Sequence, residues 1–329
     1  MALKLTTYFR DSTLPVLPGS DTFQSTKLFH IYEETSCYDP ILIVATEGDQ
    51  VVGKLLAVIQ ENKKWFLPIR IKLCQVFGGG EYFIEGRENI ENTFNEMLQR
   101  LTEVVFQRKA NIIEVRNLRQ SLFGYRPFRD NGFFAINWLR VRNVFHSDDT
   151  IEEQISPSKL RLIRKAINNG AVVREARNAE EIKAFVTMLR RNYSSKIRKH
   201  FPTPDFFQQL VKTGTFGQEG RIFIVLYKGK IIGGSTLMYS QDTAYLWFSG
   251  GLRKTYRRLY PGILAVWKAL TDAKERGYKH LEFMDVGLPF RKHGYREFVL
   301  YFGGEQISTR RWFRFKWNVL NKILNKFYS

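Results

Sequence analysis

Apolar, β-branched runs flank a glycine-centred turn at two places in the chain, around Gly48 and around Gly229. The four runs are residues 41–44 and 51–59 in the first half and residues 222–225 and 231–239 in the second half. Short β-branched runs on either side of a glycine turn are typical of β-hairpins. The pattern therefore predicts one hairpin in each half of the chain.

The elements that follow each hairpin also correspond. In each half the pattern predicts a strand that ends in glycines, then a helix with one apolar stripe, then a buried strand. The segments are 73–77, Gly78–Gly80, 90–109 and 112–115 in the first half, and 244–248, Gly250–Gly251, 263–276 and 280–286 in the second. This duplicated order predicts an α/β protein with mixed (α+β) sheets, built from two tandem domains packed together.

A helix start near the middle of the chain marks the expected domain boundary. Ser156 is expected to cap the start of this helix and Pro157 to be its first residue, and Gly170 is expected to end it. We therefore expect an N-terminal domain over residues 1–149 and a C-terminal domain over residues 150–329.

Composition and charge narrow the classes of partner. Hydrophobic residues make up 44% and aromatic residues 15% of the chain, which is enough for two packed cores and excludes a disordered protein. Lys and Arg number 51 against 32 Asp and Glu, giving a net charge of +19. This excess indicates an anionic partner: nucleic acid, an acidic membrane surface or a phosphate-bearing ligand. Charge alone does not decide among these three kinds of partner.

Cysteine usage and hydropathy predict the compartment. Cys37 and Cys74 have no CxxC spacing and no neighbouring His pair, so we expect neither a disulfide framework nor a metal site. Residues 1–18 lack the apolar stretch of a signal peptide, and no window approaches the roughly 20 apolar residues of a membrane span. We expect a cytoplasmic protein, with peripheral contact to the inner face of the membrane left open.

A basic loop between a strand and a helix is the main candidate for a ligand site. Glycines let a ligand approach the backbone, and the unpaired N–H groups of a helix start together with arginines favour phosphates. The candidate residues are Gly250, Gly251, Arg253, Arg257, Arg258 and Gly262. Such an arrangement is typical of a pyrophosphate cradle; the alternative is a solvated loop before an ordinary helix.

The segment from Leu252 to Leu264 resembles motif A of the GNAT superfamily, in which a strand, an Arg/Gly loop and a helix hold the pyrophosphate of an acyl-coenzyme A. Leu259, Tyr260 and Pro261 occupy the part of the loop where that family usually has glycines. The resemblance implies a GNAT-like acyltransferase domain whose donor is an acyl-coenzyme A or an acyl-carrier protein.

Other stretches, taken in order, are similar to the Fem-type (FemAB-like) branch of tandem-GNAT proteins, which includes peptidoglycan-bridge aminoacyl transferases and polysaccharide-locus acyltransferases. The stretches are residues 158–166, 206–210, 229–234, 285–287 and 302–304. This resemblance implies two GNAT folds and transfer of an acyl or aminoacyl group to an amine. It implies a donor-binding, catalytic second domain and a degenerate first domain with a structural or acceptor-side role.

Transfer to an amine needs a base for the amine proton and a group that polarises the carbonyl. Asp285 lies at the C-terminal end of the strand predicted over 280–286, where open α/β sheets bind ligands, and is the candidate base or amine-positioning group. Tyr295 is the candidate acid for a leaving thiolate or hydroxyl, and His293 is a further catalytic candidate in the same loop. The alternatives are a loop cap for Asp285, aromatic packing for Tyr295 and a surface role for His293.

Basic residues outside the loop are candidates for binding the acceptor. They are Lys159, Arg161, Lys196 and Arg291. In Fem-type relatives the region comparable to residues 190–200 faces the substrate cleft, which implies a phosphorylated or lipid-linked acceptor. Residues 310–329 alternate cationic and aromatic side chains before an apolar stretch, which predicts either contact with an anionic membrane or a last strand and packing helix.

The sequence thus predicts an N-acyltransferase that moves an acyl group from a thioester to an amine without a metal, in cell-envelope or polysaccharide biosynthesis. One alternative is an aminoacyl-tRNA-dependent transferase acting on a peptidoglycan precursor, which the positive charge favours and the lack of a heptad-rich hairpin disfavours. The other is a non-catalytic protein that binds anions, RNA or membranes on a degenerate transferase fold.

Overall fold

The structure is a computed structural model that describes residues 2–62, 71–118, 122–193, 201–212 and 220–328. The chain divides into two compact units. Unit 1 comprises Met1–Trp138 and Ser308–Ser329, and unit 2 comprises Leu139–Ile307. This division differs from the predicted boundary near residue 150, because the C-terminal segment returns to unit 1.

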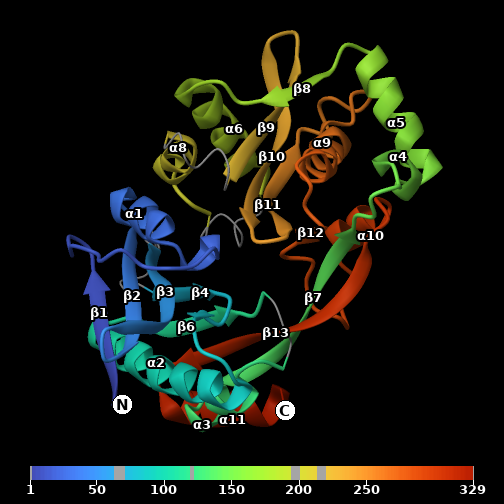
Figure 1. Ribbon diagram of the computed structural model, residues 1–329. Helices are drawn as coiled ribbons and strands as arrows, with labels where there is room; N and C mark the ends of the chain where they lie inside the picture. Colours follow the sequence, from blue (N-terminus) through green and yellow to red (C-terminus); the bar gives the residue numbers. More distant parts are fainter. Residues whose placement is uncertain (1, 63–70, 119–121, 194–200, 213–219, 329) are drawn as a thin grey trace. The chain divides into compact units, whose positions relative to one another are not determined.

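Unit 1 is a mixed sheet covered by helices (Figure 1). Its elements are β1 (Leu3–Phe9), η1 (Thr22–Gln24), α1 (Thr26–Glu34), β2 (Tyr38–Glu47), β3 (Gln50–Asn62), β4 (Ile71–Phe77), β5 (Glu81–Tyr82), α2 (Arg87–Gln107), β6 (Ile112–Arg116), α3 (Tyr125–Asp130), β7 (Phe134–Val144), β13 (Glu305–Phe315) and α11 (Asn318–Tyr328). The strand order is β1-β2-β3-β4-β6-β13, and β5 pairs with β3. Strand β7 leads the chain into unit 2, and β13 leads it back.

The predicted hairpin of the first half is β2–β3, with Gly48 at φ 60° in its turn. Side chains alternate between the two faces of a strand. Ile41 and Ile43 of β2 pack in the same buried cluster as Leu98 of α2, while α1 contacts β2 from the other face (Figure 1). Both faces of the hairpin are therefore buried, which explains its continuous apolar runs.

The C-terminal segment belongs to the core of unit 1. Strand β13 pairs antiparallel with β6 from Arg311 to Phe315. The fully buried Trp312 stacks on Phe128 of α3, with ring centroids 4.6 Å apart. The prediction of a last strand and a helix over residues 310–329 is confirmed, and these contacts explain why the segment groups with unit 1.

A buried ion cluster lies where β13 meets β6. Glu114 accepts hydrogen bonds from Gln75 at 3.0 Å and Arg311 at 3.1 Å, and pairs with Arg116 at 3.0 Å. Burial raises the pKa of Glu114, but the charges of Arg116 and Arg311 and the hydrogen bonds outweigh burial and lower it to about 2. The folded state therefore favours the carboxylate more strongly than the unfolded chain does.

The stability contributed by this cluster should disappear in acid. It is fully present above the ordinary Glu pKa near 4.5 and is lost as the pH falls toward about 2. We expect wild type and Glu114→Gln to have different unfolding free energies at neutral pH, measured by urea titration. This difference should shrink by about 3 kcal/mol on acidification. Parallel curves for the two proteins across this range would contradict the assignment.

The glycine run of the first half does not form an open cradle. A Cβ on Gly79 would lie 2.4 Å from the Phe123 ring, and the Tyr82 hydroxyl donates to the Gly79 carbonyl at 2.7 Å. Helix α2 begins only at Arg87, after β5. Aromatic side chains thus fill the space beside these glycines.

Unit 2 contains parallel and antiparallel strands of its own. Its remaining elements are α4 (Ile151–Gln154), α5 (Pro157–Asn168), β8 (Val172–Glu175), α6 (Ala179–Asn192), α8 (Pro204–Lys212), β9 (Gly220–Tyr227), β10 (Lys230–Ser240), β11 (Thr243–Gly251), α9 (Pro261–Glu275), β12 (His280–Phe283) and α10 (Gly294–Leu300). The strand order is β7-β12-β11-β10-β9-β8. The predicted hairpin is β9–β10, with Lys228 and Gly229 both at positive φ, as a tight hairpin turn requires.

Helices α6 and α9 lie on opposite faces of this sheet (Figure 1). A Cβ on Gly234 of β10 would lie 2.7 Å from the Phe185 ring of α6, so the missing side chain allows α6 to approach. The next residue, Ser235, donates its hydroxyl to the Ala265 carbonyl of α9 at 3.1 Å. The sheet between these helices carries the predicted site residues at the C-terminal ends of β11 and β12.

Candidate active site

Strands β11 and β12 share only part of their length. Strand β11 pairs with β10 as far as Gly251, but its parallel pairing with β12 stops at Leu246 and Phe283. The strand predicted over 280–286 therefore ends at Phe283, and Asp285 lies in the loop beyond it. Parallel strands that stop pairing at their C-terminal ends create a usual location for ligands in α/β proteins.

The two predicted cradle glycines Gly251 and Gly262 lie against each other. A Cβ on Gly251 would come within 2.7 Å of the Gly262 backbone nitrogen and 2.9 Å of Pro261. Gly233 on β10 is similarly tight against Pro261. The glycines at these strand positions therefore let the first turn of α9 pack directly on the sheet.

The start of α9 has an available backbone donor. Ile263 and Leu264 both donate their N–H groups to the Tyr260 carbonyl. Within the described ranges, the Gly262 N–H donates to no protein oxygen, and a Cβ at Gly262 would meet nothing within 4 Å. An open N–H at a helix start suits an anion.

Tyr260 adopts a backbone conformation that glycine usually supplies. Its φ of 42° and ψ of 49° are left-handed. Where the GNAT loop usually has glycines, this chain thus keeps the glycine-type turn with a tyrosine, whose ring packs against the unit 2 core. The departure in sequence does not remove the turn that leads into α9.

The predicted arginines surround this helix start as exposed side chains. Arg253, Arg257 and Arg258 all lie in the loop between β11 and α9. The loop is held at one point by Asn169 of α5, whose amide donates to the Arg258 carbonyl at 3.1 Å. The guanidinium groups therefore remain accessible while their backbone is tethered.

Three hydroxyl groups meet near the end of β11. The Tyr295 hydroxyl of α10 lies 2.9 Å from the Ser249 hydroxyl. The Tyr193 hydroxyl donates to the Ser249 carbonyl at 2.8 Å and accepts from the Ser249 N–H at 3.3 Å. Asn192 likewise donates to the Gly251 carbonyl at 3.2 Å. Side chains from the end of α6 thus satisfy the backbone of β11 beyond its pairing with β12.

Asp285 acts electrostatically on this cluster. Burial is the main cause that raises the pKa of Tyr193 and of Tyr295, and the negative charge of Asp285 raises both further. The charge of Asp285 therefore acts on both hydroxyls. Both tyrosines stay protonated at neutral pH, and the catalytic roles of Asp285 and Tyr295 stay predictions.

Arg296 organises the loop that carries Asp285. This buried guanidinium donates to the carbonyls of Leu288 at 2.8 Å, Arg291 at 2.6 Å and Val286 at 3.3 Å. Arg291, a predicted acceptor-binding residue, is exposed and is held through its backbone. Arg296 therefore fixes the path of the chain from Val286 to Arg291.

His293 supports the same loop by packing. A Cβ on Gly287, which has φ 85°, would lie 2.7 Å from the His293 ring. The His293 Nδ1 is buried, and no atom in the described residues hydrogen-bonds to it. The predicted catalytic role of His293 stays a prediction, and its observed contact is with the turn at Gly287.

The other predicted acceptor residues lie on different elements. Lys159 of α5 has its ammonium 4.6 Å from the Tyr301 ring centroid, in a cation–π contact. Arg161 is exposed on α5, and Lys196 lies outside the described residues. From the basic region 190–200, Arg190 and Arg191 line a cavity of 260 Å³ together with Val186, Thr187 and Pro204.

Sequence reasoning missed three residues of this site: Tyr193, Ser249 and Arg296. Tyr193 and Ser249 are far apart in sequence, and neither forms part of a recognisable motif. The signal that could have found them is the strand end itself, since backbone groups without a strand partner need side-chain partners. In the described residues, no group of three or more His, Cys, Asp or Glu side chains could hold a metal ion.

Comparison with known proteins identifies an acyltransferase domain of the GNAT type in unit 2. Residues 158–307 match the family model described as Acetyltransferase (GNAT) domain, so this part of the chain, nearly all of unit 2, is a GNAT domain. No curated protein matches the sequence.

Solved structures extend the similarity to the whole chain. FemX is similar with a TM-score of 0.62 and 14% identity over 94% of this chain and 95% of its own. A tandem GNAT protein from the clavulanic acid biosynthesis pathway has a TM-score of 0.56 and 12% identity over 95% and 98%. The C-terminal domain of a protein named as a lysylphosphatidylglycerol synthetase from Agrobacterium fabrum has a TM-score of 0.52 and 11% identity, over 82% of this chain and 84% of its own. The predicted tandem-GNAT, Fem-type fold is confirmed.

Proposed function

We propose that this protein is an N-acyltransferase that moves an acyl group from an acyl thioester, acyl-coenzyme A or acyl-carrier protein, to an amine. The observation that carries the proposal is that one strand serves both halves of the reaction. Ser249 of β11 holds the hydroxyl cluster near Asp285, and Gly251 of the same strand abuts the open N–H of Gly262. A donor phosphate at Gly262 would thus bind beside the acid and base candidates.

The donor site has the chemistry that a pyrophosphate requires. The Gly262 N–H and the helix dipole of α9 favour an anion, and Arg253, Arg257 and Arg258 add positive charge without being buried. A pantetheine phosphate, whether free in coenzyme A or on a carrier protein, has the same chemistry. No residue of the loop contributes a carboxylate that would oppose it.

The reaction follows from the positions of Asp285 and Tyr295. The amine nitrogen attacks the thioester carbonyl carbon, forming the C–N bond, and Asp285 accepts the proton that the amine loses. As the C–S bond breaks, the Tyr295 hydroxyl donates its proton to the sulfur. The raised pKa of Tyr295 keeps that proton in place before transfer, and Ser249 orients the hydroxyl at 2.9 Å.

The acceptor is an amine on a phosphorylated or lipid-linked molecule of the cell envelope or of a polysaccharide. The support is the positive charge of the chain, the exposed Arg291 in the loop that follows Asp285, and the similarity in fold to FemX and to a protein named as a lysylphosphatidylglycerol synthetase. Unit 1, whose glycine run is filled by aromatic side chains, has a structural or acceptor-side role.

A second candidate is an aminoacyl-tRNA-dependent transferase acting on a peptidoglycan precursor. The net charge of +19 and the similarity in fold to FemX favour it. Here the same Asp285 would deprotonate the acceptor amine, and the arginines of the β11–α9 loop would bind tRNA phosphates. Donor screening with coenzyme A thioesters and with aminoacyl-tRNA separates the two candidates.

Gly262→Asp tests the donor site. The position is open, and a carboxylate in the first turn of a helix favours the helix, so the variant should fold at least as stably as wild type. The same carboxylate repels a phosphate at the Gly262 N–H. We expect coenzyme A to raise the melting temperature of wild type, since a ligand at 100 times its Kd adds about 2.7 kcal/mol to the stability of the folded state. It should leave the melting temperature of Gly262→Asp unchanged.

Gly294→Asp is the matched control, because Gly294 also opens a helix, α10, and a Cβ there also meets open space. It should keep the coenzyme A response. If Gly262→Asp binds coenzyme A as tightly as wild type, the pyrophosphate does not bind at α9. If neither wild type nor variant responds, the donor is carrier-bound or is an aminoacyl-tRNA.

A further inference from the structure

Helix α11 of unit 1 leaves an apolar stripe uncovered. Val319, Ile323 and Phe327 are 71%, 49% and 79% exposed. They are spaced four residues apart, so they lie along one side of the helix. On the opposite side Asn321 is buried, and the half-exposed Tyr328 ring stacks on Phe134 of β7. The stripe is therefore the apolar face that α11 turns away from these contacts.

The C-terminal segment that carries this stripe has charged residues of one sign. From residue 306 to the end of the chain there is no Asp or Glu. The basic residues of the segment are Arg310, Arg311, Arg314, Lys316, Lys322 and Lys326. Lys322 and Lys326 are exposed on α11 itself. An apolar stripe flanked by Lys322 and Lys326 is complementary to an anionic, apolar partner.

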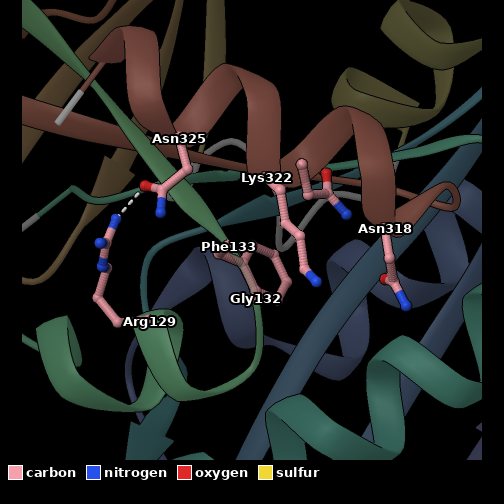
Figure 2. A pocket seen from close by; sticks show the side chains of 7 residues that line it. Arg129, Gly132, Phe133, Asn318, Lys322 and Asn325 are labelled. Atoms are coloured by element: carbon pink, nitrogen blue, oxygen red, sulfur yellow. Dashed lines mark hydrogen bonds between the residues drawn. The ribbon is translucent and has the colours of Figure 1, made fainter.

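A polar pocket adjoins the same helix. Its cavity of 280 Å³ is lined by Arg129, Gly132, Phe133, Asn318, Asn321, Lys322 and Asn325 (Figure 2). Asn325 accepts a hydrogen bond from Arg129, and Asn321 is occupied by the Phe315 backbone, to which its amide donates and from which it accepts at 2.8 Å. Within the described residues, the Lys322 ammonium and the Asn318 amide have no hydrogen-bond partner.

These features follow one another around the helix. At about 100° per residue, the side chains pass from the pocket amides through Lys322 and Lys326 to the stripe of Val319, Ile323 and Phe327. Polar, cationic and apolar zones in this order match the layers of a membrane surface, where phosphates lie above the acyl chains. The eleven residues of α11 give about 16 Å of helix, too short to cross a bilayer. No helix in the described part of the chain is long and apolar enough to span one.

We propose that α11 lies in the surface of an anionic phospholipid membrane. Val319, Ile323 and Phe327 insert toward the acyl chains, Lys322 and Lys326 lie at the headgroups, and one lipid phosphate occupies the pocket between Arg129 and Lys322. The proposal does not depend on the donor site, because α11 and the pocket belong to unit 1 and the donor site to unit 2.

Vesicle flotation of the full-length protein tests the proposal. Wild type should float with phosphatidylcholine vesicles that contain phosphatidylglycerol, and not with pure phosphatidylcholine vesicles. Ile323→Ser with Phe327→Ser should weaken the partition at least about tenfold. Lys322→Gln with Lys326→Gln should weaken it about 25-fold, since each lysine near an anionic surface contributes about 1 kcal/mol, and should reduce its dependence on salt.

Leu122→Ser is the control, because Leu122 is a 57% exposed apolar residue of the same unit that does not belong to α11 or line the pocket. It should float as wild type does, and all variants should melt at the wild-type temperature because the substituted side chains are exposed. Equal flotation of wild type and the stripe variant overturns the proposal, as does flotation independent of phosphatidylglycerol or no flotation at all. A dimer that Phe327→Ser converts to a monomer also overturns it, since a second copy would then cover the stripe.

Discussion

Asp285→Asn is expected to lower kcat by about 10²–10⁴-fold and to leave the melting temperature unchanged. Asp285 is exposed in the loop after β12, so an amide can replace its carboxylate without burying a new polar group. The amide cannot accept a proton from the amine. The measurement is the rate of acylation at saturating donor and acceptor, compared with coenzyme A binding, which the substitution should preserve.

The matched control is Asp242→Asn, at the hairpin turn where β11 begins, remote from Ser249 along the strand. It should keep full activity. Tyr295→Phe should retain the base but lose the acid, so its deficit should shrink with a thioester whose thiol is more acidic. Normal turnover by Asp285→Asn with a proven donor and acceptor would remove Asp285 from the mechanism. A non-catalytic binding protein predicts no turnover in any of the three.

Glu282→Gln is expected to lower the unfolding free energy by about 3–5 kcal/mol. The Glu282 side chain is fully buried and pairs with Arg140 and Arg142 of β7, with an Arg142 Nε–carboxylate distance of 2.7 Å. Arg140 is itself 3% exposed. Removing the carboxylate charge leaves a buried guanidinium without its counter-ion, and this desolvation cost is the reason for the large effect.

Urea denaturation of wild type, Glu282→Gln and a control variant measures this effect. Glu275→Gln is the control in the same unit: Glu275 is 63% exposed and its pair with Lys268 spans 3.4 Å. We expect no measurable change there, since exposed ion pairs contribute little. A Glu282→Gln protein as stable as wild type would mean that water reaches Arg140 and that β7 and β12 do not need the pair.

The duplicated fold could be predicted because both halves encode it locally. The turns at Gly48 and Gly229 and the apolar runs beside them specify hairpins without reference to distant residues. The return of residues 308–329 to unit 1 could not be predicted, because a strand such as β13 has the same alternation whichever sheet receives it. Contacts with residues distant in sequence determine the choice, among them the stacking of Trp312 on Phe128 and the pairing of Arg311 with Glu114.

The candidate site divides in the same way. Asp285 and Tyr295 could be named as candidates because both follow the same buried strand closely in the sequence, where α/β proteins usually bind ligands. Tyr193 was missed because its role depends on where β12 stops pairing with β11, which is a property of three elements at once. The αL turn at Tyr260 was missed for a related reason: sequence patterns assign that conformation to glycine.

Tyr193 and Asn192 already occupy backbone hydrogen-bonding groups at the end of β11. A ligand laid along it must displace hydrogen bonds that already exist, so each backbone contact it makes is an exchange with almost no net gain. For the donor proposed above, the net gain in affinity would then come from the charges at the start of α9. At this strand end, the side chains of Asn192 and Tyr193 therefore compete with any ligand for the same backbone groups.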